Sequence, residues 1–238
     1  MSDHQLLTSD THRALRIDTG RRADLGDAVM SCIVVPTEFR RVQADYPILF
    51  RLNAARDAFT ALAIFGFENG ENLFLDDRGW DAGYVPLAID IQPFLIGGAG
   101  PHSEDKQVHI DMDHPRVGAA DGVRVFDEHG MATPYLDAMA GKLGALDEGY
   151  QGMAGFFAAL NDHELLEPLT LEITLDDGSI NRLVGFHTID EGRLHDLDGD
   201  ALGDLHAAGD LLPIFMAVAS IGRLNDLIAR KNRKVARG

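Results

Sequence analysis

One spacing of histidine and acidic residues in this 238-residue chain suits a metal ion. His109 and Asp111 lie two positions apart in an apolar run, residues 108–112, that is typical of a strand. Alternate residues of a strand face the same side, so both side chains could bind one ion. His187 would complete the two-histidine, one-carboxylate set of Fe(II) oxygenases. With 10 histidines and 38 acidic residues, such a set arises readily by chance, so we expect no metal and no other cofactor.

Glu71 and Asn72 form a second candidate site together with two aromatic residues. They follow a turn signal and precede an apolar run, and Trp80 and Tyr84 come shortly after. Aromatic side chains supply contact area for a ligand, and an acid or amide sets its orientation. The simpler interpretation is that Glu71 and Asn72 bind turn backbone while Trp80 packs in the core. These four residues are nevertheless the best ligand-binding candidates in the sequence.

The remaining motifs indicate no catalytic residue. The chain contains neither a glycine-rich phosphate loop nor a Gly-x-Ser-x-Gly nucleophile elbow. Residues 196–200 alternate aspartates as a calcium loop does, but the glycine and glutamate that an EF-hand needs at positions six and twelve are alanines. A turn that caps a helix explains this segment better. Whether the protein catalyses a reaction therefore stays open.

The composition is that of a soluble globular protein, with 45% hydrophobic and 25% charged residues. A single cysteine, Cys32, cannot form an internal disulfide, so nothing indicates an oxidising compartment. The longest apolar run, residues 211–221, is about half of the ~20 residues that a membrane span needs. We expect a cytoplasmic protein without a membrane span.

The charge is strongly negative, at −17, and unevenly distributed. Residues 23–229 hold 12 of the 21 basic residues and 35 of the 38 acidic ones, so the two ends are cationic. A negative surface repels phosphate backbones, which excludes nucleic acid as the main partner. A protein or peptide partner is expected, and a cationic one suits the acidic body. The basic residues from Arg230 to Arg237 suit a solvated helix end, an acidic partner or the protein's own surface.

The pattern of elements predicts a single α+β domain with a mainly antiparallel sheet and packed helices. Closely spaced apolar runs at residues 33–35, 46–52 and 59–67 favour antiparallel strands, because a parallel crossover needs more residues. Residues 169–175 and 180–186 flank an Asp-Gly turn and predict a hairpin. Helices are predicted from Pro134 to about residue 143, and at 152–160, 201–208 and 211–231. Residues 1–27 are predicted to be a flexible arm, 28–232 the domain and 233–238 a basic tail.

Several segments, in this order and spacing, resemble the bacterial SapC family. The resemblance covers roughly residues 32–233 and rests on Tyr46-Pro47-Ile48-Leu49-Phe50, Gly70-Glu71-Asn72-Leu73-Phe74, Trp80 with Tyr84-Val85-Pro86, Pro93-Phe94, Ile110-Asp111, Asp177-Gly178, Gly185-Phe186, Ile189-Asp190-Glu191 and Arg230-Lys231-Asn232. The family pattern has basic residues where this chain has Asp90 and Gln92, an aromatic residue at His187, and no fixed histidine at His109. These departures weaken the iron-site interpretation.

The resemblance implies a non-catalytic accessory or binding protein of a bacterial cell-envelope or peptide-modification system, since the family has no established catalytic residues. Its members are known beside outer-membrane receptors, flavin-dependent halogenases and hydroxylase-like proteins. Two alternatives stay open. One is an Fe(II)/2-oxoglutarate-type oxygenase acting on a peptide or protein, and the other is a structural component of a bacterial surface layer.

Overall fold

The computed structural model describes residues 3–98 and 106–237 of the chain. Helices and antiparallel sheets are mixed along the chain, which confirms the predicted α+β class. The described residues group into two compact units, each built from two separate segments. Unit 1 contains the chain up to Asp27 and Leu87–Glu148, and unit 2 contains Ala28–Pro86 and residues 149–237. The predicted division into an arm, a domain and a basic tail stays a prediction.

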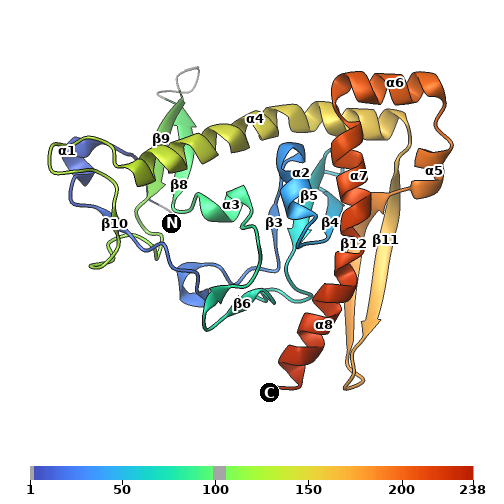
Figure 1. Ribbon diagram of the computed structural model, residues 1–238, viewed down its shortest axis with the longest axis horizontal. Coiled ribbons are helices and arrows are strands. Elements are labelled where there is room, and N and C mark those ends of the chain that lie inside the picture. The colour runs from blue at the N-terminus through green and yellow to red at the C-terminus, as the bar shows by residue number, and fades with distance from the viewer. Residues whose placement is uncertain (1–2, 99–105, 238) are drawn as a thin grey trace. The chain divides into compact units, whose positions relative to one another are not determined.

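Unit 1 is built around a small antiparallel sheet (Figure 1). Its strand order is β1 (His4–Leu6), β9 (Lys106–Asp111) and β8 (Phe94–Gly98), and β2 (Arg16–Ile17) pairs separately with β10 (Val123–Arg124). Short helical turns join them: α1 (Ser9–His12), η1 (Ala23–Leu25) and α3 (Leu87–Asp90). Strands β1 and β2 lie in the segment for which the sequence predicts a flexible arm. They pair with strands about a hundred residues later, and local composition carries no signal of such distant pairing.

Unit 2 contains a five-stranded antiparallel sheet. Its strand order is β11 (Leu166–Thr174), β12 (Ile180–Ile189), β4 (Ile48–Leu52), β5 (Phe59–Ile64) and β3 (Ser31–Ile33). The first two strands form the hairpin that the Asp-Gly turn predicts, with Leu166 opposite Ile189 at its base. A small second hairpin consists of β6 (Leu75–Asp76) and β7 (Gly79–Trp80).

Unit 2 also contains a series of helices. They are η2 (Pro36–Glu38), α2 (Phe39–Val42), α5 (Glu191–His195), α6 (Gly199–Ala208), α7 (Leu211–Ser220) and α8 (Arg223–Val235). Helix α7 contacts β4 and β12 (Figure 1). The sequence predicts one helix over residues 211–231, but a turn at Ile221 and Gly222 separates α7 from α8. Glycine is a poor helix former, and the chain is free to turn there.

Helix α4 (Pro134–Asp162) is a single helix of 29 residues, where the sequence predicts two. Its repeated glycines lower the helix propensity, which is why the pattern indicates a break. At Gly149 tertiary packing outweighs propensity, because a Cβ there would collide with the side chain of Val35. The glycine lets the helix backbone lie directly against that residue.

Aromatic side chains fill the core of unit 2. Phe157, from the second part of α4, meets Phe50 edge-on at 5.6 Å and stacks on Phe59 at 5.8 Å between ring centres. Phe156 meets Phe39 edge-on at 5.9 Å. Such arrangements suit the quadrupoles of the rings. The sheet and helices of unit 2 are therefore a packed scaffold on which surface side chains are positioned.

Residues Leu211–Val235, which span α7 and α8, are long and apolar enough by length and composition to cross a membrane. Core helices of soluble proteins can have the same properties. In unit 2, Oγ of the buried Ser220 accepts a hydrogen bond from Ile48 N at 2.9 Å, and the buried Lys231 forms ion pairs. These contacts belong to a helix pair packed in protein. The absence of a membrane span remains a prediction.

Candidate functional site

The turn that carries Glu71 and Asn72 is shaped by these two side chains. Oε2 of Glu71 accepts a hydrogen bond from Phe67 N at 3.1 Å, and Oδ1 of Asn72 accepts one from Phe74 N at 2.9 Å. Gly66 allows the turn to close, since a Cβ there would lie 2.6 Å from the carbonyl oxygen of Glu71. Both polar side chains are buried. These hydrogen bonds to turn backbone are the structural role that the sequence offers as the alternative to ligand binding for Glu71 and Asn72.

Glu71 also holds helix α8 against this turn. Its Oε1 accepts hydrogen bonds from Lys231 Nζ at 2.8 Å and from Lys234 Nζ at 3.3 Å. Lys231 also donates to Glu68 at 3.0 Å. Burial alone would raise the pKa of Glu71, but the hydrogen bonds from Lys231 and from the Phe67 amide keep that pKa below its usual value. The carboxylate is therefore ionised at neutral pH and anchors α8.

Trp80 and Tyr84 belong to a chain of hydrogen bonds beneath the β6–β7 hairpin. Trp80 Nε1 donates to Tyr46 Oη at 2.7 Å, and the Tyr46 hydroxyl donates to the carbonyl of Tyr84. The Tyr84 hydroxyl in turn donates to Oε2 of the buried Glu38 at 2.7 Å. Trp80 also packs edge-on against Phe65. These contacts place both predicted residues in the framework of the hairpin.

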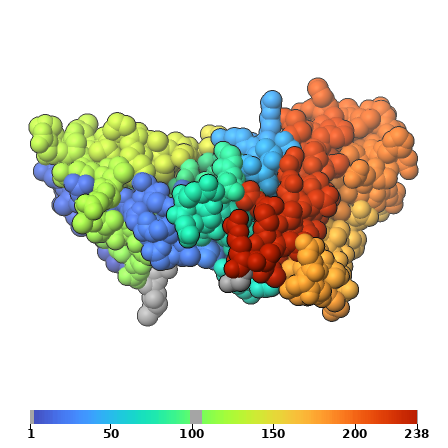
Figure 2. Space-filling view, turned by 60° about the horizontal axis from the view of Figure 1, so that its bottom comes forward, coloured from blue at the N-terminus to red at the C-terminus, as the bar shows by residue number. Residues whose placement is uncertain are grey.

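A groove of about 370 Å³ lies between the segment 72–81 and helix α8. Its lining includes Asn72, an apolar strip and seven charged residues: Asp76, Arg78, Asp81, Arg230, Arg233, Lys234 and Arg237. Five of these seven are basic. Figure 2 shows α8 in dark red at the surface, beside the turquoise segment that contains β6 and β7. Of the four predicted ligand-binding residues, only Asn72 lines this groove.

The basic side chains of the groove differ in how they are paired. Arg230 lies 4.3 Å above the ring of Phe74 and donates to Asp81 Oδ2 at 2.8 Å. Arg233 and Arg237 are exposed, and neither forms an ion pair within the described residues. Arg233 lies in the last turn of α8, and Arg237 lies in the turn that follows the end of the helix at Val235. The groove therefore carries positive charge that the protein does not neutralise.

The sequence signal for this groove was the cluster of basic residues at the end of the chain. A solvated helix end is the simplest interpretation of this basic cluster, and it holds for Arg233 and Arg237. Arg230, Lys231 and Lys234 instead pair with acidic residues of the segment 68–81. The two halves of the site are about 150 residues apart, and neither half alone indicates the other.

The residues of the iron-site alternative belong to two different units. His109 and Asp111 lie on β9 in unit 1, and His187 lies on β12 in unit 2. Within residues 3–98 and 106–237, no group of three or more His, Cys, Asp or Glu side chains is placed to hold a metal ion. The His187 ring meets Phe59 edge-on at 4.9 Å, and burial lowers its pKa. The imidazole of His187 is therefore neutral and packs against the ring of Phe59.

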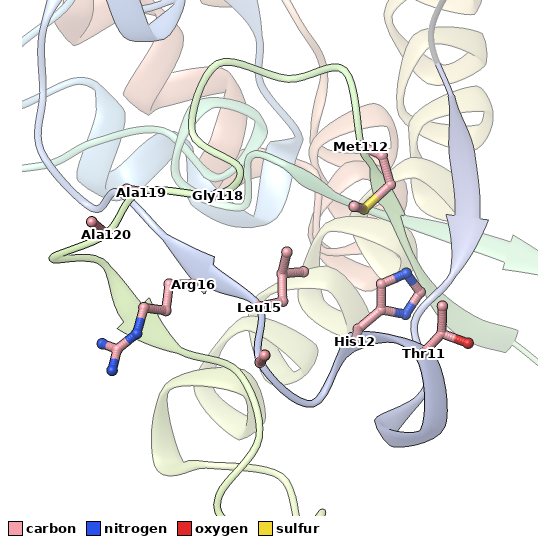
Figure 3. A pocket seen from close by; sticks show the side chains of 9 residues that line it. Thr11, His12, Leu15, Arg16, Met112, Gly118, Ala119 and Ala120 are labelled. Carbon is pink, nitrogen blue, oxygen red and sulfur yellow. The ribbon is translucent and has the colours of Figure 1, made fainter.

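A cavity of about 470 Å³ in unit 1 is lined by α1, the residues after it and the loop around Gly118 (Figure 3). The only imidazole among its lining residues is that of His12, whose Nε2 lies 3.2 Å from Gln5 Oε1 and whose Nδ1 accepts from Thr8 N. The guanidinium of Arg16 extends away from His12 and donates to the carbonyl of Gly122. Both ring nitrogens of His12 have structural partners, so this cavity offers little chemistry.

The family model that matches this chain is described as SapC, and it matches residues 7–227. Neither the curated proteins nor the solved structures include a match to the chain. The match covers both units and every residue of the candidate site up to Leu227, whereas Arg230 to Arg237 lie beyond it.

Proposed function

Because this chain belongs to the SapC family, we propose that it is a non-catalytic binding protein whose groove takes an acidic segment of a peptide or protein. The observation that carries the proposal is the pair of exposed, unpaired arginines, Arg233 and Arg237, beside an apolar strip. We further propose that the protein acts in the cytoplasm as an accessory component of a cell-envelope or peptide-modification system, the setting that the family resemblance implies.

The lining of the groove supports recognition of carboxylates. Guanidinium groups donate in a planar fork that matches a carboxylate, and those of Arg233 and Arg237 extend from the last turn of α8 and the turn after it. Leu75 is partly exposed and provides apolar area for a neighbouring side chain of the ligand, while Leu73 and Phe74 lie buried beneath the groove. The arrangement suits a peptide in which acidic and apolar residues alternate.

The same lining supports binding rather than catalysis. Among the described residues that form it, none is a histidine, cysteine, serine or threonine. Asp76 and Asp81 pair with Arg78 and Arg230 and so have no evident part as a general base. The groove therefore supplies positive charge and contact area without a nucleophile.

The test is the affinity of the full chain for a fluorescein-labelled peptide that alternates glutamate and leucine, measured by fluorescence anisotropy at low salt. Replacing both arginines, Arg233→Gln and Arg237→Gln, should weaken binding about 10-fold, since two exposed charge contacts are worth about 1.4 kcal/mol together. The matched control is Arg182→Gln with Arg193→Gln. These exposed arginines are paired with Glu172 and Glu164, and the pair changes the net charge equally.

Equal affinity of the groove variant and the control variant would contradict the proposal. The same peptide with lysine in place of glutamate tests the cationic partner that the acidic body favours. If the lysine peptide binds better than the glutamate peptide, the partner is cationic and the groove is not its site. Trp80 is the single tryptophan of the chain, so a change in its emission on binding would report directly from the β6–β7 hairpin.

The two other functions have no comparable support. An oxygenase would require His109, Asp111 and His187 around one iron, and the described residues bring no such group together. Stoichiometric iron in the purified protein, lost in a His109→Ala variant, would nevertheless overturn a non-catalytic role. A structural surface-layer component would be exported and form a lattice, so recovery of the protein only in the cytosolic fraction would exclude it.

A further inference from the structure

Unit 1 contains a pocket with charged residues in its lining, none of which lines the groove of the proposed function. It has a volume of about 370 Å³, and its lining consists of Asp18, Thr19, Arg21, Asp90, Gln92, Arg116, Val123 and three side chains of α4, Tyr135, Met139 and Lys142. Its charged lining consists of three cations, Arg21, Arg116 and Lys142, and two acids, Asp18 and Asp90. Volumes of this size accommodate small ligands.

The charged groups of the pocket are held by a continuous series of ion pairs. Lys142 Nζ lies 2.6 Å from Asp90 Oδ2, and Asp90 also pairs with Arg21. Arg21 reaches Asp27 at 3.4 Å, and Arg116 binds both oxygens of Asp27 at 2.7 and 2.8 Å. Each side chain is thus fixed by its neighbours, so the pocket is preorganised.

Arg116 has one donor that the protein leaves unused. Its Nη1 donates to the carbonyls of Asp18 and Gly20, and its Nη2 donates to Asp27. The side chain is 98% buried, and its Nε–H has no acceptor among the described residues. This nitrogen is itself closed to solvent, so Arg116 acts on the pocket through its charge and not through a direct contact.

We propose that this pocket binds the carboxylate of an amino-acid-sized molecule. Its oxygens would accept from Lys142 and from the hydroxyl of Tyr135, which both line the pocket. Cations outnumber acids in the lining, which favours an anionic group over a cationic one. Val123 and Met139 provide an apolar wall for a short side chain of the ligand.

Tyr135 can serve as a hydrogen-bond donor throughout the neutral range. Burial raises the pKa of Tyr135 to about 12, so the hydroxyl keeps its proton. Asp18 and Asp90 lie in the same lining and could accept from a hydroxyl or an ammonium group next to the carboxylate. An amino acid and a hydroxy acid both carry such a group next to a carboxylate, so the pocket suits either class of ligand.

The experiment uses three probes with one carbon skeleton on the full chain: L-leucine, its hydroxy-acid analogue 2-hydroxy-4-methylpentanoate, and L-leucinamide. Calorimetric titration should show binding in the millimolar range for either or both carboxylates. L-leucinamide keeps the ammonium group but lacks the carboxylate, and it should not bind. The preference between the first two identifies the amino-acid or the hydroxy-acid source.

Two variants locate the binding. Lys142→Gln should weaken binding of the preferred carboxylate about 5-fold, because a charged donor is lost while Asp90 keeps its pair with Arg21. Lys106→Gln is the control, since Lys106 also pairs with an aspartate of unit 1, Asp147, but does not line the pocket. Tyr135→Phe removes only the hydroxyl and should weaken binding without unfolding the protein.

The proposal is overturned if neither carboxylate binds to the wild-type chain at millimolar concentrations. It is equally overturned if L-leucinamide binds as well as L-leucine, or if Lys142→Gln and Lys106→Gln have the same effect. Because Lys142 is partly exposed and Tyr135→Phe changes a single atom, these variants avoid the folding defect that substitution of the buried Arg116 would cause.

Discussion

Basic side chains have opposite surroundings in the groove of unit 2 and the pocket of unit 1. In the groove, Arg233 and Arg237 are exposed and unpaired within the described residues, and basic residues outnumber acidic ones. In the pocket, Arg116 is buried and every cation of the lining has a carboxylate partner. The groove thus offers free charge to a partner, whereas the charges of the pocket are paired with one another in a fixed network.

This difference separates two uses of charge that the net value of −17 conceals. Exposed arginines contribute little to folding, so they remain available for binding. Buried ion pairs contribute to binding only through the geometry that they impose, and breaking one of them destabilises the fold. Removal of one charge should therefore weaken binding in the groove but destabilise the fold in unit 1.

The largest effect is expected from Asp27→Asn in unit 1. The substitution keeps the size of the side chain but leaves the buried Arg116 without its carboxylate. We expect a loss of about 3 kcal/mol in the free energy of unfolding, because an uncompensated charge remains buried. Urea unfolding followed by circular dichroism measures this loss, and amide hydrogen exchange in β9 locates it in unit 1.

Asp24→Asn is the control for this substitution. Asp24 pairs with Arg22 three residues before Asp27, but its side chain is 70% exposed. Removing this surface pair should change the unfolding free energy by less than about 1 kcal/mol. If the two variants were equally stable, the pocket network would not be buried as described, and the contrast with the groove would disappear.

The parts of the fold that could be predicted from the sequence are those whose signals are local. Asp177-Gly178 between two alternating runs specifies the β11–β12 hairpin. Asp198 caps α6 by accepting from Ala201 N, as the favoured interpretation of residues 196–200 required, and Gly209 ends that helix with a φ of 84°. Each of these elements depends on contacts within a few residues, so sequence pattern is sufficient.

The candidate sites depend on contacts that local patterns do not contain. Glu71 and Asn72 were recognised as a polar turn, but the partner of Glu71 is Lys231, 160 positions later. The pocket was missed altogether, because Arg116 and Asp27 are 89 positions apart and lie in segments without regular periodicity. The uneven distribution of charge along the chain does not indicate either of these two ion pairs.

A smaller effect is expected from Glu71→Gln, which tests the anchor of the groove. Glutamine removes the charge that Lys231 and Lys234 share, but Lys231 keeps its contact with Glu68. We expect a loss of about 2 kcal/mol in the unfolding free energy. Trp80 emission during urea unfolding measures it, since this single tryptophan lies in unit 2.

Glu68→Gln provides a matched comparison on the same lysine. Glu68 binds Lys231 at 3.0 Å, but its side chain is 61% exposed. Its removal should change the unfolding free energy by less than about 1 kcal/mol. Equal losses for the two variants would mean that burial does not distinguish the two carboxylates, and Glu71 would lose its role as the anchor of α8.

The smallest effect is a pH dependence of the same anchor. The pKa of Glu71 in the folded protein lies below its ordinary value of 4.5, because hydrogen bonds from Lys231 and Phe67 N outweigh the opposing effect of burial. A lowered folded pKa stabilises the protein above pH 4.5, and this contribution is lost as the pH falls through the folded pKa. The difference in unfolding free energy between wild type and Glu71→Gln should therefore be constant from pH 7 to pH 5.5 and should shrink below about pH 4.5. Using the difference cancels the titration of other groups. A difference that grew on acidification would show that Glu71 is not a paired carboxylate, and the groove would then lack the fixed wall on which Arg233 and Arg237 are displayed.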